Sequence, residues 1–382
     1  MIKKNIAILG STGSIGINTL KVIARYRDRF NVVALTAYQN CELLLEQARK
    51  FTPKYVAATD DGIGNLKKHL GIRKARVFNV HHDLPMIASL PDVDVVILAM
   101  RGSAALLPFL SAVRAGKIVA PANKEALVIA GDILMEEARQ FGATIIPIDS
   151  EQSAIFQCLN GQKRQELKRV HLTASGGALL RVPSSKFDRL TVKQILDHPR
   201  WKMGPKITVD SATLMNKGFE VIEAQKLFGL KADEINVVVH PEAIIHSMVE
   251  FNDGSIMAQL AVTDMRLPIQ YALTYPERLP TGLPDLDFFN LKSLHFEKPD
   301  IKKFPSLALA FYAAQKGGSL PCVLNAADEE AVEAFLKKKI TFTKIYDVIE
   351  RIVLKHKLVK KPQLNQILDV DRWAREETRK LL

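Results

Sequence analysis

The sequence predicts an α/β fold in three parts: a doubly wound parallel sheet, a central α+β region and a helical C-terminal region. Over the first part, short apolar runs alternate with helix-length amphipathic segments, which is typical of a parallel sheet with helices on both faces. After Ser150 the alternation stops, and from Ser306 the pattern is helical to the end. The length of 382 residues also exceeds what one hydrophobic core usually serves. We expect domains at 1–149, 150–275 and 301–382, with a proline-rich linker at 276–300.

Six apolar runs should form the strands of the first domain. They are Asn5–Leu9, Asn31–Ala37, Tyr55–Ala58, Val93–Ala99, Ile118–Ala122 and Thr144–Ile148. Helices should begin near Ser14, Cys41, Ser103 and Lys124. Ligands of such sheets bind at the carboxyl ends of the strands, so the loops that follow the strands are where a site is expected.

The central region mixes helices with strands. We expect helices at Gln152–Leu159 and Ser211–Phe228, separated by a strand at Val170–Ala174 and a polar, proline-bounded stretch at 183–205. Further strands are expected at Ile235–Val239, Ser247–Phe251 and Ser255–Val262. The last two flank Asn252-Asp253-Gly254, a strong signal for a hairpin.

Charge and hydropathy exclude two classes of partner. The net charge of +12 would suit nucleic acid, but residues 335–382 carry 13 Lys/Arg against 6 Asp/Glu along helix-like segments without exposed aromatic residues between them. That pattern indicates a solvated basic face. No apolar run approaches the roughly 18 residues of a membrane helix. We expect no nucleic-acid partner and no membrane association.

Cysteine usage and the N-terminal residues favour the cytoplasm. Cys41, Cys158 and Cys322 lack paired spacing, which argues against a disulfide framework and against a zinc site. Met1 to Leu9 has no long apolar region or cleavage site of a signal peptide.

A glycine loop follows the first expected strand. Gly10, Gly13 and Gly16 are spaced G-x-x-G-x-x-G and open the first helix. Glycines allow a sharp turn and close approach of a pyrophosphate, while the helix N-terminus offers free N–H groups. The position predicts a Rossmann-like dinucleotide site, and a plain glycine turn is the alternative.

The end of the second strand favours NADPH. Ala37-Tyr38-Gln39-Asn40 contains no acidic residue, whereas NAD enzymes usually place Asp or Glu there to bind the ribose diol. No Lys or Arg is present either, so this preference is inferred from the absence of repulsion.

Three acids form a candidate metal site. Asp149 and Glu151 follow an expected strand, and their side chains would point the same way if that strand continued. Glu220 lies on a later expected helix. Carboxylate oxygens suit Mg²⁺ or Mn²⁺ better than zinc. Helix capping or surface salt bridges would be the ordinary alternative for such acids.

Polar residues near these acids suit a phosphate monoester. They are Ser175, Ser211, Asn216 and Lys217. On a helix, Asn216 and Glu220 share one face, so a single helix would offer both a phosphate ligand and a metal ligand.

The motifs occur in an order, from residue 5 to about 340, that resembles the 1-deoxy-D-xylulose 5-phosphate reductoisomerase family of the non-mevalonate isoprenoid route. The motifs are Gly10–Gly16, Ala122–Glu125, Asp149–Glu151, Ser175–Gly177, His198–Gly204, Asp210–Glu220, His240–Glu242, Asp264–Arg266 and Asn325–Ala327.

The resemblance implies roles for individual residues. The metal ligands would be Asp149, Glu151 and Glu220. These three would act in catalysis with Lys124, His198 and His240. The substrate contacts would be Lys124, Ser150, Glu151, Ser175, His198, Trp201, Met203, Ser211, Asn216, Lys217 and Glu220. The NADPH contacts would be Gly10, Ser11, Thr12, Gly13, Ser14, Ile15, Ala37, Gln39, Asn40, Asn123, Glu125 and Gly204.

The resemblance also implies the reaction. Metal-assisted rearrangement of 1-deoxy-D-xylulose 5-phosphate would be followed by hydride transfer from NADPH, giving 2-C-methyl-D-erythritol 4-phosphate. His198, Trp201 and Met203 would lie on a mobile flap, and the enzyme would be a homodimer. The alternative for His240 is an ordinary structural role. The alternative for Trp201 is a place in the hydrophobic core.

Two other functions are compatible with the glycine loop. An aspartate-semialdehyde-dehydrogenase-like enzyme needs a nucleophilic cysteine. Cys41 falls early in the second expected helix, Cys158 near a helix end and Cys322 in the C-terminal segment, so none is placed as a nucleophile should be. A non-catalytic NADP-binding regulator would not need the acids and the phosphate set.

Five residues depart from the usual family pattern. Tyr38 replaces glycine, Arg101 lies in a usually apolar turn, Pro121 replaces leucine, Gln152 replaces histidine and Asp328 replaces asparagine.

Overall fold

The computed structural model describes residues 3–70, 75–201 and 203–382. The chain divides into two compact units that do not follow the chain order. The first comprises Met1–Ala126, Leu134–Ser153 and Asp264–Leu283, and the second comprises Leu127–Ile133, Ala154–Thr263 and Pro284–Leu382. The three-part functional division expected from the sequence stays a prediction.

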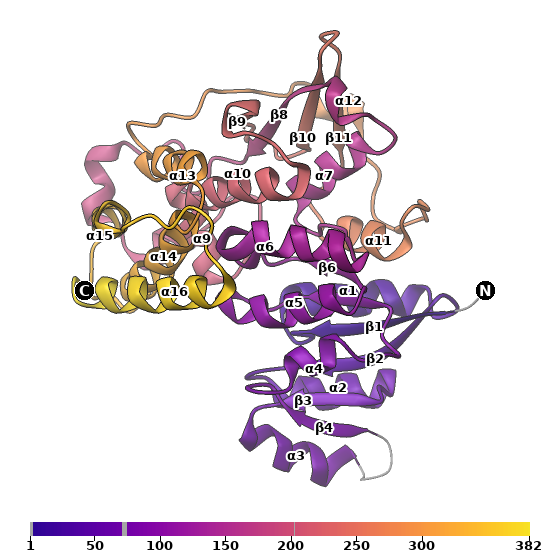
Figure 1. Cartoon of the computed structure of the whole chain (residues 1–382). Helices are drawn as coiled ribbons and strands as arrows, with labels where there is room; N and C mark the ends of the chain where they lie inside the picture. Colours follow the sequence, from indigo (N-terminus) through magenta and orange to yellow (C-terminus); the bar gives the residue numbers. More distant parts are fainter. Residues whose placement is uncertain (1–2, 71–74, 202) are drawn as a thin grey trace. The chain divides into compact units, whose positions relative to one another are not determined.

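The first unit contains a seven-stranded parallel sheet with the order β4-β3-β2-β1-β5-β6-β7 (Figure 1). Its strands are β1 (Lys4–Leu9), β2 (Phe30–Thr36), β3 (Tyr55–Ala58), β4 (Arg76–Asn79), β5 (Val95–Leu98), β6 (Ile118–Pro121) and β7 (Thr144–Ile145). The central strands are apolar and buried, which confirms the predicted parallel sheet.

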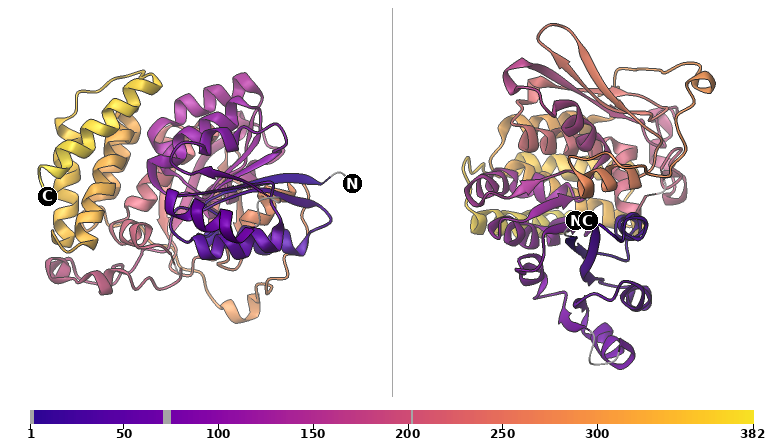
Figure 2. Two further views of the ribbon diagram at one scale, coloured as in Figure 1. Left: turned by 90° about the horizontal axis from the view of Figure 1, so that it is seen from below. Right: turned by 90° about the vertical axis from the view of Figure 1, so that its right-hand side faces the viewer.

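Helices lie on both faces of this sheet (Figure 2, left). They are α1 (Ser14–Arg25), α2 (Cys41–Phe51), α3 (Asp60–Leu70), α4 (Leu84–Ala88), η1 (Gly102–Ala105), α5 (Leu106–Arg114), α6 (Glu125–Phe141) and α11 (Arg266–Thr274). Helix α6 begins in this unit, and its Leu127–Ile133 segment belongs to the second unit. The doubly wound arrangement expected from the alternating pattern is therefore confirmed.

The strand predicted at Thr144–Ile148 is wrong in its second half. β7 ends at Ile145, although the N–H groups of Ile146 and Ile148 still donate to carbonyls of β6. The carbonyl acceptor for Ile148 belongs to Pro121, whose own nitrogen carries no hydrogen to complete the ladder. The chain turns into α7 (Ser150–Leu159), so Asp149 and Glu151 do not alternate along a strand as expected.

The second unit contains a four-stranded mixed sheet with the order β11-β10-β8-β9. Its strands are β8 (Leu167–Ala174), β9 (Ile235–Val239), β10 (Ile245–Phe251) and β11 (Ile256–Leu260). β10 and β11 pair antiparallel across the Asn252–Gly254 turn, where Gly254 has φ of 87°. The predicted hairpin is therefore confirmed.

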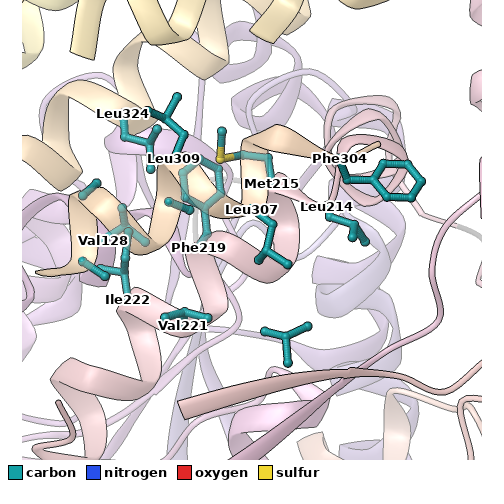
Figure 3. Close-up of a cluster of buried hydrophobic side chains, with 14 of the residues drawn as sticks. Val128, Leu214, Met215, Phe219, Val221, Ile222, Phe304, Leu307, Leu309 and Leu324 are labelled. Carbon is teal, nitrogen blue, oxygen red and sulfur yellow. The ribbon is translucent and has the colours of Figure 1, made fainter. Parts of the chain in front are cut away.

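The remaining helices of the second unit surround an apolar core. They are η2 (Arg164–Glu166), η3 (Ser184–Arg189), α8 (Val192–Ile195), α9 (Pro205–Thr213), α10 (Met215–Phe228), η4 (Ala232–Glu234), α12 (Phe288–Leu291), α13 (Pro305–Lys316), α14 (Leu320–Leu336), α15 (Phe342–Lys355) and α16 (Leu364–Arg379). Figure 3 shows Met215, Phe219 and Ile222 of α10 packed with Leu309 and Leu324 in this core.

The single helix predicted over Ser211–Phe228 is wrong, because the chain breaks it at Leu214. Leu214 has φ of 61° in the left-handed region, and its N–H donates to the carbonyl of Ser211. Its side chain is buried, and packing offsets the local strain. Ser211 therefore lies at the end of α9, whereas Asn216 and Lys217 lie in the first turn of α10.

The proline-bounded stretch expected as a flap is partly anchored. η3 buries Phe187 and α8 buries Ile195 in the core of the second unit. The flap itself stays a prediction.

Within the described residues, no helix combines the length and the apolar character that crossing a membrane requires.

Candidate active site

The glycine loop has the tight geometry of a phosphate-binding turn. Gly10 has φ of 95°, and a Cβ there would lie 2.7 Å from the carbonyl oxygen of Ala99 on the neighbouring strand end. A Cβ on Gly16 would lie 2.4 Å from the carbonyl oxygen of Gly10. Gly13 is the N-cap of α1 and has no side chain to cap the helix, so the first N–H groups stay open to an anion.

The side chain of Ser11 has a structural role in this loop. It is fully buried, and its hydroxyl lies 2.7 Å from Oε1 of Gln47 and 3.2 Å from the carbonyl oxygen of Thr36. Nε2 of Gln47 donates back to the carbonyl of Ser11. The N–H of Ser11 also donates to the carbonyl of Thr36, so both the side chain and the backbone of Ser11 are engaged within the loop, whereas Ser14 is exposed at the start of α1.

The end of β2 presents one aromatic side chain and no cation. Ala37 is buried, Gln39 is exposed, and Tyr38 leaves 61% of its surface exposed. Oδ1 of Asn40 accepts from the N–H of Leu43 and caps α2. The capping role of Asn40 could be anticipated from its place before a helix.

Asn123 holds the turn that follows β5. Its Nδ2 donates to the carbonyls of Met100 and Gly102 at 3.1 and 3.2 Å, and its Oδ1 accepts from the N–H of Ala126. This side chain fixes the backbone on both sides of Arg101. Its action on a cofactor would pass through that turn.

Lys124 forms a largely buried ion pair with a predicted metal ligand. Its Nζ lies 2.7 Å from Oδ2 of Asp149, and only 6% of its side chain is exposed. Lys124 is the N-cap residue of α6, and Glu125 lies in the first turn of that helix. Ser150 donates its hydroxyl proton to the adjacent carboxylate of Glu151.

The three predicted metal ligands offer oxygens within reach of one cation. A carboxylate oxygen from each of Asp149, Glu151 and Glu220 lies within 4.8 Å of the other two. Oxygens bound to one Mg²⁺ or Mn²⁺ at about 2.0–2.1 Å would be separated by roughly 3–4 Å, so this spacing needs only small side-chain rotations.

The first turn of α10 joins this acidic group to the phosphate candidates. Nδ2 of Asn216 donates to Oε1 of Glu220 at 2.6 Å, as the shared helix face predicted. Lys217 forms a close ion pair with the other oxygen of Glu220. Both partners of this ion pair are buried.

His198 orients the hydroxyl of Ser175. Nδ1 of His198 accepts the N–H groups of Arg200 and Trp201, at 3.2 and 2.9 Å, so Nε2 carries the proton. Nε2 lies 3.1 Å from Oγ of Ser175, which also accepts the N–H of Gly177. Because Ser175 Oγ accepts hydrogen bonds from both of these donors, its own proton points away from them. Burial lowers the pKa of His198 and favours this neutral form.

The serine loop after β8 packs directly on Ser211. A Cβ on Gly177 would lie 2.4 Å from the carbonyl oxygen of Ser211, and Gly177 has φ of 67°. Only glycine allows this contact. Two of the predicted phosphate ligands, Ser175 and Ser211, are thereby held in adjacent turns.

His240 has a structural environment. It is fully buried, its Nδ1 lies 2.9 Å from the carbonyl oxygen of His295, and its Nε2 accepts the N–H of Ile244. Its ring stacks on Phe296. Nδ1 also lies 3.1 Å from Oε2 of Glu242. Both nitrogens are thus engaged within the fold, so this arrangement supports the structural alternative.

His246 was missed by the sequence reasoning. Its ring centroid lies 6.4 Å from that of Trp201, the expected cover of the substrate. Trp201, Met203 and Gly204 are half-buried. The signal available was the second histidine in the His240–His246 stretch, six residues along at the start of β10.

A buried charge cluster follows Gly204 and was also missed. Nζ of Lys206 lies 2.5 Å from Oδ2 of Asp210 and 2.7 Å from Oδ2 of Asp328. Burial raises the pKa of Asp328, and Lys206 opposes that rise. Asp210 immediately precedes Ser211, so the cluster ties the serine to α14.

Comparison with known proteins assigns the whole chain. Three family domains match in order: 1-deoxy-D-xylulose 5-phosphate reductoisomerase (residues 6–131), its C-terminal domain (145–228) and the DXP reductoisomerase C-terminal domain (260–377). The reductoisomerase of Pelotomaculum thermopropionicum is 50% identical over 97% of both chains, and that of Geobacter metallireducens is 49% identical over 99% of both. The chain belongs to the 1-deoxy-D-xylulose 5-phosphate reductoisomerase family.

Solved reductoisomerases share the fold over their full length. The Zymomonas mobilis enzyme, solved with NADPH, has a TM-score of 0.93 at 38% identity and covers 100% of this chain and 99% of its own. A reductoisomerase solved with NADPH, fosmidomycin and magnesium gives 0.93 at 39% identity, covering 99% and 98%. The resemblance drawn from the motifs and the predicted fold class are therefore confirmed.

Proposed function

We propose that this chain converts 1-deoxy-D-xylulose 5-phosphate to 2-C-methyl-D-erythritol 4-phosphate with NADPH as reductant. The observation that carries the proposal is the convergence of Asp149, Glu151 and Glu220, with Asn216 and Lys217 contacting Glu220 from the same helix. This arrangement brings a cation site and a phosphate site together, as an enzyme that binds a small phosphorylated sugar through a metal requires.

The acids fit a hard divalent cation. Three carboxylates this close would repel one another, and Glu220 is completely buried. A set of oxygen donors suits Mg²⁺ or Mn²⁺, and Asp149, Glu151 and Glu220 would hold the ion. Bound there, the ion would polarise the substrate carbonyl and stabilise negative charge on oxygen.

The glycine loop fits NADPH. The close backbone approach at Gly10 and the uncapped start of α1 provide space and N–H donors for a pyrophosphate. NADPH supplies the hydride. The role of the chain is to bind the dinucleotide at the ends of β1 and β5.

Ser175, Ser211, Asn216 and Lys217 would bind the substrate phosphate. His198 prepares Ser175 as a donor, and Gly177 fixes Ser175 beside Ser211. Lys217 supplies the positive charge, and binding far from the reacting carbons orients them. Ser150 and Lys124, which lie next to the acids, would contact the hydroxyl and carbonyl end.

The chain segments would divide this work. Residues 1–149 would bind NADPH, 150–275 would carry the metal and phosphate sites with the flap, and 301–382 would support them. Trp201 and Met203 would cover bound substrate from the flap.

We further propose a cytoplasmic homodimer. None of the three cysteines, all of them among the described residues, forms a disulfide, as in a reducing compartment. The edge strand β11 exposes Ile256 and Met257, and α12 exposes Phe289, whose surface is 97% accessible. A second copy would cover this apolar surface. Light scattering of the purified chain tests the proposal, and a monomer at all concentrations would refute it.

One assay tests the main proposal. The purified chain should oxidise NADPH only when substrate and Mn²⁺ or Mg²⁺ are both present, and product should accumulate in equal amount. A regulator that merely binds NADP would bind the cofactor without turnover.

A further inference from the structure

The end of β2 leaves the 2′-phosphate of NADPH without a cation. Residues Ala37–Asn40 include no Lys or Arg, and Asn40 caps α2. A phosphate dianion is most strongly bound through charge-assisted hydrogen bonds, usually from arginine. Another residue of the first unit is needed to supply that charge.

Arg101 lies at the crevice where a dinucleotide would cross the sheet. It follows β5, which lies beside β1 on the side away from β2, so the strand order switches direction between β1 and β5. Ligands of open α/β sheets bind at such a switch point. The glycine loop touches the same turn, since a Cβ on Gly10 would meet the carbonyl oxygen of Ala99.

The backbone of Arg101 is fixed while its side chain is exposed. Asn123 binds the carbonyls of Met100 and Gly102 on either side of it. Among the described residues, no carboxylate forms an ion pair with the Arg101 guanidinium. A positive charge is thus held at the crevice without a counterion.

We propose that Arg101 recognises the adenosine 2′-phosphate of NADPH and so determines the preference for NADPH over NADH. A guanidinium is permanently charged, binds phosphate through two parallel N–H donors and can stack on the adenine face at the same time. The inference rests on the proposed function, because it requires NADPH at the end of β1.

His81 is a second basic residue to consider. Its ring packs edge-on against Tyr38, with 5.4 Å between centroids. Although His81 follows β4, this contact places its ring near the end of β2. Asn79 in the same turn binds Asp60 through Nδ2 and Asp83 through its backbone N–H. These carboxylates would repel a phosphate, so the surroundings favour Arg101.

Calorimetric titration of the full chain with adenosine 2′,5′-bisphosphate and with 5′-AMP tests the inference. Arg101→Ala should lower the affinity for the bisphosphate about 10- to 100-fold and the affinity for 5′-AMP less than about 2-fold. Arg101→Lys should lower the affinity for the bisphosphate by a smaller factor. Arg49→Ala is the control, because Arg49 lies exposed in the last turn of α2, away from the carboxyl ends of the strands. Thermal melts establish that each variant is folded.

Each outcome decides the matter. Selective loss of the bisphosphate, with the NADPH-to-NADH ratio of kcat/KM falling in parallel, supports the role of Arg101. Equal loss of both ligands, no loss, or a selective loss in His81→Asn instead would overturn it. Wild-type enzyme that fails to turn over substrate with NADPH would refute the proposed function, whereas normal wild-type turnover with an unselective Arg101→Ala refutes this inference alone.

Discussion

Lys217 and Glu220 form an ion pair one helical turn apart on α10, with 4% and 1% of their side-chain surfaces exposed. Such a pair loses much of its hydration, and removing one partner leaves an uncompensated buried charge. In the proposed enzyme, a cation approaches Glu220 and a phosphate approaches Lys217. Each charge would then gain a second partner of opposite sign, which links metal binding to substrate binding.

Glu220→Gln should abolish metal-dependent turnover while preserving the fold. The amide keeps the size of the side chain but removes the charge that a divalent cation requires. Because loss of even an outer-shell partner costs about 10–100-fold in metal affinity, loss of a ligand should lower affinity for Mn²⁺ by at least about 100-fold. Isothermal titration calorimetry with Mn²⁺ measures this affinity.

Chelation and a surface variant are the controls for Glu220. EDTA should stop wild-type turnover without changing the circular dichroism spectrum, because neither sheet depends on these acids. Glu333→Gln, at an exposed pair with Lys337 on α14, should leave Mn²⁺ affinity unchanged. Wild-type Mn²⁺ affinity in Glu220→Gln would remove Glu220 from the metal site.

Lys217→Ala should weaken binding of the phosphorylated substrate by about 1.5–3 kcal/mol, the usual contribution of a hydrogen bond to a charged group. The variant also leaves Glu220 buried without its cationic partner, so its melting temperature should fall without metal. Added Mn²⁺ should raise the melting temperature of the variant by more than it raises that of the wild type. Steady-state kinetics and thermal melts measure both effects.

Lys226→Ala is the matched control, because this lysine lies on the same helix and pairs with exposed Asp132. It should change neither KM nor the response to Mn²⁺. An unchanged KM in Lys217→Ala would remove the phosphate assignment.

The sequence predicted those features that local patterns encode. The apolar strands β1, β2, β3, β5 and β6, the glycine loop and the hairpin at Gly254 all have direct signals. β4 was missed because Arg76–Asn79 is a partly exposed edge strand with little apolar contrast. The break at Leu214 has no local signal, since a leucine at positive φ is tolerated only through tertiary packing.

The candidate site shows the same limit. The order of the motifs grouped Asp149, Glu151 and Glu220 as metal ligands through the family resemblance. Their spacing along the chain could not show that the three side chains lie close together. The orientation of Ser175 by His198 and the cluster around Asp328 depend on contacts between distant segments. A lone histidine such as His240 or His246 carries no local mark that separates a structural role from a role in the site.

His198 should control substrate binding through Ser175 in a pH-dependent way. Burial holds the pKa of His198 below its usual value, so the neutral ring is the form present near neutral pH. Protonation at Nδ1 would break its bonds from Arg200 and Trp201, so the arrangement is present above the folded pKa and lost as pH falls through it. KM should therefore rise from about pH 7 to about pH 5.

His198→Gln separates this effect from titration of the substrate phosphate, which also occurs near pH 6. The variant should show only the phosphate component, with a shallower rise of KM and little change in kcat. Identical pH profiles for the two proteins would mean that His198 does not act through its protonation state.

Asp328→Asn should stabilise the protein at neutral pH and above. Asp328 is completely buried beside Lys206 and Asp210, so one lysine faces two carboxylates. Burial raises the pKa of Asp328 above that of the unfolded chain. A group with a raised folded pKa contributes most stability below its unfolded pKa, and that contribution is lost as pH rises through the folded value. Wild-type stability should therefore decline with rising pH in that window.

Asparagine copies the shape of the protonated acid and cannot ionise, so Asp328→Asn should remove that decline. The gain should be largest at alkaline pH and should shrink as the pH falls into the range where Asp328 is protonated. Urea unfolding at several pH values measures it. Asp369→Asn, at an exposed pair with Arg372, is the control and should show no such pH-dependent gain. A variant that is less stable at every pH would instead show that Lys206 requires two ionised partners, and that Asp328 holds α14 to α9 as a charge.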